Sequence, residues 1–366
     1  MKIFKVILLV FNVVVIALML GSTMAGKVDP GKSIFFSILG YGYLYFLIAD
    51  VVFLVLWLLV GSKWFLLSLV SILLRYGFLP LYFQTGGTEL LTEGERVERG
   101  AVKIMTFNVH HFKGEDFVEG VQDTNMMQFL RMIDRETPDV LALQEYVGCG
   151  DTLHLTERIV ERGYRYQISG YTSGAMTGEV IFSKLPTLGV VRFEEPRNFY
   201  ADLLWRDDTL RVYCLHLESY GLDDSDQKQL DDIRHGNMDS KTGRSTYHKF
   251  RETIHAHGEE WQLIEQLLSR RTTRTIVAGD FNDPPSSYFY QQSRTLLKDS
   301  YCEAGQGFST TYHGNFTRRR NAIFPSFRID MVLHTPDMEA IAYKRIKSDI
   351  SDHYPVVVTL GSRKKE

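Results

Sequence analysis

The sequence predicts an α/β protein in which a hydrophobic N-terminal segment precedes one large soluble domain. From Met1 to Gln84 the chain is almost uncharged, whereas from Gly86 onward its composition is that of an ordinary soluble protein. From Val102, short β-rich runs alternate with amphipathic helical stretches, which is the pattern of an α/β fold. The 366 residues leave room for both parts, because a single α/β domain reaches about 250 residues.

Three apolar segments fill the N-terminal part: residues 3–20, 34–60 and 64–83. A membrane-spanning helix needs about 17–25 mostly apolar residues, so each segment is long enough to span. A cleaved signal peptide, suggested by Lys2 and Lys5, would account for the first segment only and leave two spans. We expect a three-helix membrane anchor over residues 1–84, a polar linker over residues 85–100 and a soluble domain over residues 101–362.

Asp50 and Arg75 are charged residues within the second and third apolar segments. Each lies about 12 residues from the turn at residues 61–63, hence about 18 Å along an antiparallel helical hairpin. Because an unpaired charge inside a membrane is costly, we expect an ion pair between them. The alternative is that each side chain occupies a polar pocket of its own or reaches the interface.

The distribution of lysines gives the expected orientation. Lys2, Lys5 and Lys63 favour a cytoplasmic N-terminus, whereas Lys27 and Lys32 oppose it. With three spans, the soluble domain is then expected outside the cytoplasm.

The soluble part is slightly acidic. Residues 101–366 contain 33 Lys and Arg against 38 Asp and Glu. Dedicated duplex-binding domains are usually basic, so this balance disfavours a non-specific duplex binder. The three cysteines, Cys149, Cys214 and Cys302, have no zinc or disulfide spacing, and Cys214 is expected in the core.

The β-rich runs and helical faces give the expected elements of the soluble domain. We expect buried strands at residues 102–109, 140–143, 180–183, 210–217, 275–278, 329–333 and 355–360. Met126, Phe129, Leu130 and Ile133 share one helical face, and a longer helix carries Phe250, Ile254, Trp261, Ile264 and Leu268. Residues 223–244 are polar without a period and are expected to form a surface loop.

Polar residues of types that carry chemistry lie at the ends of these strands. They are Asn108, Glu145, His216, Asp280 with Asn282, Asp330, and Asp352 with His353. Taken singly, each has a plain structural explanation, because Asn and Asp are common turn formers and caps. Hard oxygen ligands suit Mg²⁺ or Mn²⁺, so Glu145 is a natural metal anchor, with Asn108 and Asp352 completing the oxygen shell.

In this order, the strings around these residues resemble the endonuclease/exonuclease/phosphatase superfamily, which has the fold of pancreatic deoxyribonuclease. The resemblance covers Val102 to Leu360 and implies a four-layer α/β sandwich, with two central sheets covered by helices. With its hydrophobic N-terminus, the chain further resembles membrane-anchored bacterial members, which implies an integral protein of the bacterial inner membrane.

The resemblance also implies phosphodiester hydrolysis, which needs phosphate neutralisation, an activated water and help for the leaving oxygen. It implies a role for each residue. Glu145 matches the principal metal ligand, and Asp280 the residue that orients or deprotonates the attacking water. Asn282 and His353 match residues that contact the phosphate, Asp330 the carboxylate that orients this histidine, and His216 a second histidine facing the phosphate. His110 stands where some members have a metal-binding carboxylate, which is a departure from the pattern.

Several assignments stay open. The substrate is nucleic acid for a nuclease, or a lipid headgroup or small metabolite for another phosphodiesterase; an inert membrane-tethered binding protein is the third alternative. The sequence identifies no protein partner. We interpret Asp283 as a turn residue and His255 and His257 as structural or solvated. His313 and Arg318–Arg320 lie in a loop that either meets an anionic substrate or is solvated.

Overall fold

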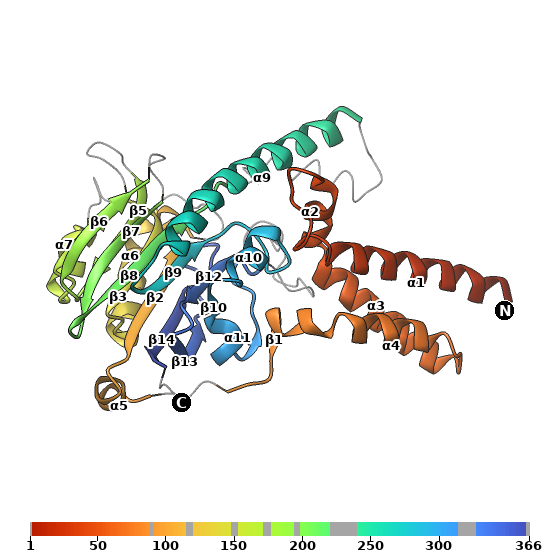
Figure 1. Ribbon diagram of the computed structural model, residues 1–366, viewed down its shortest axis with the longest axis horizontal. Coiled ribbons are helices and arrows are strands. Elements are labelled where there is room, and N and C mark those ends of the chain that lie inside the picture. Colours follow the sequence, from red (N-terminus) through yellow and green to blue (C-terminus); the bar gives the residue numbers. More distant parts are fainter. Residues whose placement is uncertain are drawn as a thin grey trace. The chain divides into compact units, whose positions relative to one another are not determined.

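The computed structural model describes residues 2–87, 91–114, 120–147, 153–170, 177–193, 198–219, 240–313 and 327–363. The chain forms two compact units. The first, here called the helical unit, comprises Met1–Tyr82, Ser219–Glu265 and Asp283–Thr295. The second, the sandwich unit, comprises Phe83–Glu218, Gln266–Asn282 and Leu296–Glu366. Their elements are labelled in Figure 1, where the N-terminal helices are red to orange.

Two six-stranded sheets form the sandwich unit. One has the order β13-β14-β2-β3-β5-β4 and consists of β2 (Val102–Asn108), β3 (Val140–Val147), β4 (Tyr166–Ser169), β5 (Thr177–Ser183), β13 (Met338–Arg345) and β14 (Val356–Ser362). The other has the order β10-β12-β9-β8-β7-β6 and consists of β6 (Thr187–Arg192), β7 (Phe199–Trp205), β8 (Asp208–His216), β9 (Arg274–Asp280), β10 (Lys298–Asp299) and β12 (Asp330–His334). The β2–β3 and β8–β9 pairs are parallel, and the other neighbours are antiparallel.

The sheets bury apolar residues on both faces, which explains why their central strands are continuous hydrophobic runs. Ile104 and Val140 of the first sheet share one core cluster with Val212 and Ile276 of the second. The other face of the first sheet packs on α6 (Gln122–Glu136) and α7 (Leu155–Glu161), with Phe129 among the contacts. The predicted α/β sandwich is therefore confirmed, as is the burial of the predicted α6 face and of Cys214.

Smaller elements complete the sandwich unit. A short helix, α11 (Ser300–Ala304), adds Tyr301 to the core between the sheets, and β1 (Phe83–Gln84) pairs with β11 (Gly307–Phe308). The expected linker contains a helix, α5 (Glu93–Glu98), which begins with a capping box of Thr92 and Glu95. Buried Arg96 of α5 pairs with Asp139, so part of the linker is built into the sandwich unit.

The helical unit contains α1 (Lys2–Ser22), α2 (Ile34–Tyr41), α3 (Tyr43–Leu59), α4 (Phe65–Leu74), the 3₁₀ helix η1 (Tyr76–Leu81), α10 (Tyr288–Ser293) and most of α9 (Ser240–Ser269). The segment Ile3–Ser22 is long and apolar enough to cross a membrane, and α2 with α3 passes the same test only as one span bent by 61°. The second expected span is thus broken at Gly42. The third contains a helix of only ten residues, because Arg75 leaves the helical conformation and a 3₁₀ turn with Pro80 follows.

The expected ion pair between Asp50 and Arg75 is wrong, because Asp50 bonds to other side chains. The buried Asp50 carboxylate accepts hydrogen bonds from Asn12 Nδ2 at 3.1 Å and from the Ser71 hydroxyl. Asn12 also donates to Ser68 Oγ at 2.9 Å and accepts from the Trp57 indole N–H at 2.9 Å. Asp50 therefore has the polar pocket of its own that the alternative predicted.

Candidate functional site

Strand register brings three predicted residues together in the second sheet. Asp280 ends β9, where its backbone pairs with His216 of β8 on one side and with Asp330 of β12 on the other. The β8–β9 pairing depends on Gly279, whose φ is +151°. A Cβ at Gly279 would lie 1.9 Å from the Leu215 carbonyl oxygen, so only glycine allows β8 to approach this closely.

Glu145 is directed by an irregularity in β3. The register with β5 shifts between Leu143 and Tyr146, and Glu145 has a φ of +52°, which is unfavourable for a residue with a side chain. Asn108, at the end of neighbouring β2, donates through Nδ2 to Glu145 Oε1 at 3.0 Å and to Asp280 Oδ2 at 3.1 Å. One amide therefore connects the carboxylates of the two sheets.

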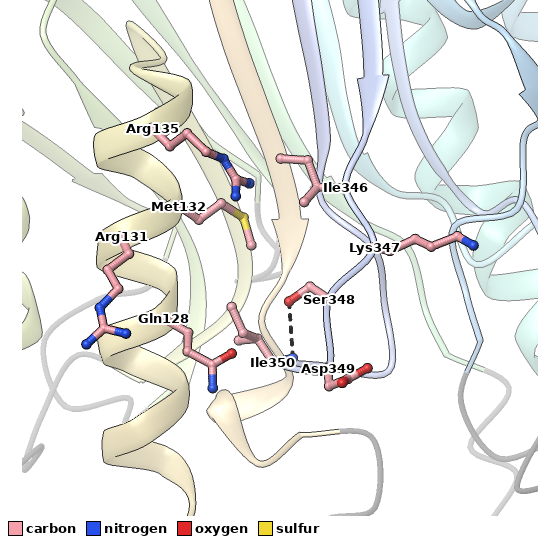
Figure 2. A pocket seen from close by; sticks show the side chains of 9 residues that line it. All are labelled: Gln128, Arg131, Met132, Arg135, Ile346, Lys347, Ser348, Asp349 and Ile350. Atoms are coloured by element: carbon pink, nitrogen blue, oxygen red, sulfur yellow. Dashed lines mark hydrogen bonds between the residues drawn. The ribbon is translucent and has the colours of Figure 1, made fainter. Parts of the chain in front are cut away.

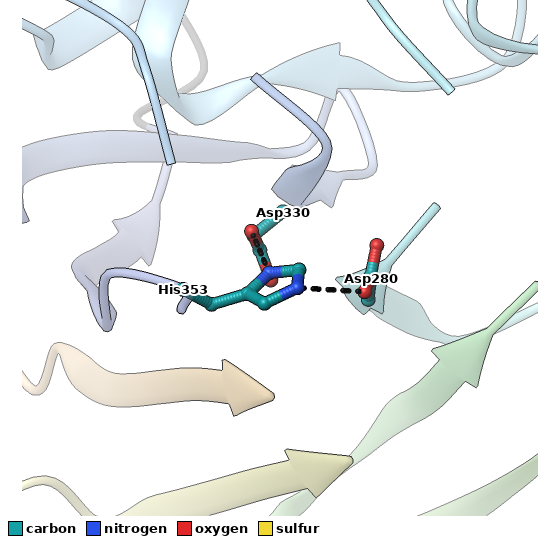
Figure 3. A group of neighbouring side chains, drawn as sticks. All are labelled: Asp280, Asp330 and His353. Carbon is teal, nitrogen blue, oxygen red and sulfur yellow. Dashed lines mark hydrogen bonds and ion pairs between the residues drawn. The ribbon is translucent and has the colours of Figure 1, made fainter. Parts of the chain in front are cut away.

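His353 is held by Asp330 and directed at Asp280. Its Nδ1 lies 2.8 Å from Asp330 Oδ2, and its Nε2 lies 3.6 Å from Asp280 Oδ2 (Figure 3). Burial opposes the charged imidazole, but Asp330 and Asp280 outweigh it and raise the pKa of His353 well above its usual value. For Asp280, burial raises the pKa of the carboxyl, although His353 and His216 act against it.

A second histidine–carboxylate pair includes a residue that the sequence analysis missed. His216 Nδ1 lies 3.0 Å from Oε1 of the buried Glu179 on β5. His216 Nε2 lies 3.8 Å from Glu145 Oε1 and 3.9 Å from Asp280 Oδ2. Burial lowers the pKa of His216, but the Glu179 hydrogen bond and the charges of Asp280 and Glu145 raise it to about 9. In the sequence, Glu179 stands directly before the buried run at residues 180–183, which indicates its place on the strand but not its partner.

Asp352 contacts His110, the residue that stands where some proteins of the resembling family have a carboxylate. Its Oδ1 lies 2.9 Å from His110 Nδ1 and accepts a hydrogen bond from Ser351 Oγ at 3.2 Å. Burial alone would raise the pKa of Asp352, but His110 and His353 hold it below its usual value. His111 Nε2 lies 3.5 Å from Glu145 Oε2. His110 and His111 both have positive φ, so this turn places two imidazoles beside the predicted metal ligands.

Asn282 lies beside Asp280, and both its backbone and its side chain donate hydrogen bonds to protein oxygens. Its backbone N–H donates to Asp280 Oδ1 at 2.9 Å, and its side-chain Nδ2 donates to the Leu217 carbonyl at 2.8 Å. Its φ of +49° is again in the left-handed region. The loop after β9 therefore holds both Asp280 and Asn282 through Asn282's own hydrogen bonds.

Tyr312 is a further neighbour that the sequence analysis did not identify. Its ring centroid lies 4.9 Å from that of His353, and its backbone pairs with His353 in an isolated bridge. Burial and the charges of Asp352 and Asp280 raise the pKa of the Tyr312 phenol. Arg318–Arg320 lie outside the described residues, as do residues 223–239 of the expected surface loop.

The ligand chemistry of the site fits a hard divalent cation. All predicted site residues belong to one connected network, and Glu145, at its centre, has 27% of its side chain exposed. As oriented, Asn108 presents its N–H groups to the carboxylates, while its Oδ1 accepts from the His110 N–H. Asp280, Asp330 and His353 form a second group that could hold a metal, with ligand atoms within 4.8 Å of one another.

A groove of about 340 Å³ on the sandwich unit is separate from these side chains. It lies between α6 and residues 346–350 (Figure 2). Its lining includes Arg131, Arg135 and Lys347 but none of the predicted site residues.

The comparisons with known proteins agree with this geometry. The model of the endonuclease/exonuclease/phosphatase family matches residues 105–353. A second model, for a domain of unknown function (DUF8431), matches residues 4–82. No curated protein matches the chain.

Solved structures share the fold. An endonuclease/exonuclease/phosphatase from Beutenbergia cavernae is 21% identical, with 72% of each chain covered and a TM-score of 0.50. Humanized D. rerio TDP2 is 15% identical over 72% of this chain and 100% of its own, also with a TM-score of 0.50.

The chain belongs to the endonuclease/exonuclease/phosphatase family. Members of this family are hydrolases that act on phosphoester bonds.

Proposed function

We propose that the protein is a divalent-metal-dependent phosphodiester hydrolase of the nuclease type. The observation that carries the proposal is the position of Asp280. Its carboxylate lies between two imidazoles, His216 and His353, each held at Nδ1 by a buried carboxylate of its own. This arrangement supplies a proton acceptor and two cationic N–H donors within one small site, which is what hydrolysis of a phosphoester requires.

The side chains divide the chemistry as follows. Asp280 accepts a proton from the attacking water, because its raised pKa makes it a stronger base than an exposed aspartate. His353 and His216 donate to phosphate oxygens through Nε2, since Asp330 and Glu179 favour their protonated forms. Asn282 fixes Asp280 through its backbone N–H.

Glu145, with Asp352 and Asn108, would hold Mg²⁺ or Mn²⁺. The bound ion would neutralise phosphate charge and polarise the phosphoryl oxygen. We assign the ion to Glu145 instead of the group of Asp280, Asp330 and His353, because the Glu145 side chain is 27% exposed and can reach a hydrated ion. Asp280 and Asp330 are buried, and Asp330 already contacts His353 Nδ1 at 2.8 Å. To bind the ion through Oδ1, Asn108 would have to release the hydrogen bond that Oδ1 accepts from the His110 N–H. We propose that Asn108 also orients Glu145 and Asp280 through the hydrogen bonds of its Nδ2.

We propose that the protein is anchored in a membrane through α1. The apolar composition and length of Ile3–Ser22 support this, and a signal sequence is the alternative. We further propose that this membrane is the bacterial inner membrane and that the site lies outside the cytoplasm. Phosphodiester hydrolysis at lipid headgroups or small metabolites is the second candidate, favoured by the acidic balance of residues 101–366.

The test is hydrolysis by the full chain in detergent micelles. DNA, RNA, bis-p-nitrophenyl phosphate and phospholipid vesicles are each assayed with Mg²⁺, with Mn²⁺ and with EDTA. Glu145→Ala and His353→Ala should lose at least about a hundredfold in kcat/KM, while the exposed α9 controls Glu252→Ala and His255→Ala should retain activity. Activity that survives EDTA, or that survives in both site variants, would refute the proposal, and the preferred substrate separates the two candidate functions.

A further inference from the structure

The chain leaves the catalytic loop at Asp283, which lies in the helical unit. Asn282 is the last residue of a sandwich-unit segment, and Asp283 is the first residue of the helical-unit segment Asp283–Thr295. Asp283 is only 2% exposed. A buried carboxylate needs partners, so the residues that hold it also determine where the loop ends.

Asp283 is held from both sides within the helical unit. The Tyr41 hydroxyl, at the end of α2, donates to Asp283 Oδ1 at 2.6 Å. His257 Nδ1 of α9 lies 3.3 Å from Asp283 Oδ2. His257 is itself fully buried and packs edge-to-face on Phe289 of α10, with ring centroids 5.8 Å apart. These contacts explain both His257, expected to be structural or solvated, and Asp283, expected to be a turn residue.

The residues after Asp283 are bound to the same N-terminal helices. Ser286 Oγ donates to the Gly40 carbonyl at 2.7 Å and accepts from the Tyr82 hydroxyl at 2.9 Å. The backbone after α1 approaches α10 so closely that a Cβ on Gly26 would lie 2.5 Å from Gln291 Cγ. The apolar N-terminal segment is therefore packed against the stretch that follows the catalytic loop.

Asn282 and Asp283 are joined by a peptide bond, so a displacement at Asp283 would reach Asn282 through the backbone. Consecutive Cα atoms are fixed about 3.8 Å apart, and Pro284 and Pro285 restrict the chain on the other side. Asn282 has a φ of +49°, in the left-handed region that asparagine tolerates better than most residues with a side chain. Its N–H is the donor to Asp280 Oδ1.

We propose that Asp283 is a positioning residue: its hydrogen bonds to Tyr41 and His257 fix the backbone that directly follows Asn282, so that turnover depends on the Tyr41 hydroxyl. This inference rests on the proposed phosphoesterase role of Asp280 and Asn282. It gives the N-terminal helices a second task besides anchoring: rearrangement of α2 or α9 releases Asp283 and lowers turnover. Activity is thereby coupled to the integrity of the helical unit.

The test compares two Tyr→Phe variants of the full chain in detergent micelles. Tyr41→Phe removes the hydrogen bond to Asp283, whereas the matched control Tyr43→Phe removes a hydrogen bond to the Arg75 carbonyl, away from the loop. Tyr41→Phe and Asp283→Asn should lower kcat about tenfold with KM changed less than about twofold, because small misplacements of reacting groups reduce turnover. Tyr43→Phe should leave kcat unchanged.

A second readout does not depend on the substrate. Amide hydrogen exchange at Asn282 reports directly on its bond to Asp280 and should accelerate in Tyr41→Phe but not in Tyr43→Phe. Wild-type exchange and kcat in Tyr41→Phe, or equal effects in both Tyr variants, would overturn the inference. If no substrate is cleaved by the wild type, the proposed function fails, whereas the exchange rates still decide whether the helices position Asn282.

Discussion

Arg328 and Asp299 form a buried ion pair whose loss should strongly destabilise the sandwich unit. Arg328 Nη2 lies 2.7 and 2.6 Å from the two Asp299 oxygens, and both side chains are 1% exposed. The guanidinium also lies 4.6 Å from the Tyr301 ring centroid, and Asp299 caps α11 by accepting from the Tyr301 N–H. Arg328 is two residues before Asp330, so the pair fixes the start of the strand that carries a site carboxylate.

The magnitude follows from this burial. Arg328→Met keeps most of the side-chain volume but leaves the Asp299 carboxylate buried without its guanidinium, which costs about 3–5 kcal/mol. For a unit of about 200 residues, 1 kcal/mol shifts Tm by roughly 2–4 °C, so a fall of roughly 10 °C is expected in calorimetry or circular dichroism. Adding Asp299→Asn should recover part of the loss, because it removes the unpaired charge.

The matched control is an exposed pair of the same chemistry. Arg162 and Asp134 form a comparable two-point contact, at 2.7 and 3.1 Å, but their side chains are 29% and 51% exposed. Arg162→Met should therefore cost less than about 1 kcal/mol. Equal shifts in Tm for Arg162→Met and Arg328→Met would refute the argument that burial sets the strength of the ion pair.

Three further predictions concern the sandwich unit. Gly279→Ala should abolish activity and lower Tm, because its Cβ would overlap the Leu215 carbonyl; wild-type kcat would contradict this. Glu179→Gln should lower kcat about tenfold or more and move the alkaline limb of the pH–rate profile down from about pH 9, because His216 loses the partner that raises its pKa; an unmoved limb would refute the role of the pair. Burial raises the pKa of Glu303, but its hydrogen bonds outweigh burial and lower the pKa to about 2. The contribution of Glu303 to stability is therefore complete above its unfolded pKa of 4.5 and is lost as pH falls through about 2. Glu303→Gln should lower the free energy of unfolding in urea by about 1–2 kcal/mol at pH 7, and a loss that does not shrink in acid would contradict this sign.

The sequence was informative wherever a residue's role is reflected in local order along the chain. Asp280 and His353 stand at the ends of buried runs, and the strand register then brings Asp280 beside His216 and Asp330. Glu179 was missed because a carboxylate at the start of a strand has no local mark of its partner, which lies 37 residues away. Tyr312 carries no such mark either, since its contact with His353 exists only in the folded chain.

The expected ion pair between Asp50 and Arg75 failed for a different reason. Matching Asp50 and Arg75 by depth fixes their position along the helices but not the side of the helix on which each lies, and Asn12 and Ser71 face Asp50 instead. Hydropathy over residues 64–83 likewise measures composition, whereas the helix ends where Arg75 departs from helical angles. Neither direction around a helix nor a local change of backbone angle is contained in an average over residue types.

The paired histidines explain how one carboxylate can serve as a base in a buried site. Both Nδ1 atoms are engaged by buried carboxylates, so both Nε2 atoms face Asp280, at 3.6 and 3.9 Å. Burial raises the pKa of Asp280, while the imidazoles oppose that rise and keep the ionised form accessible. The same imidazoles would lie against the substrate. A bound anionic phosphate would therefore offset the positive charges that stabilise the ionised Asp280 carboxylate, and Asp280 would become a stronger base when the water must be deprotonated.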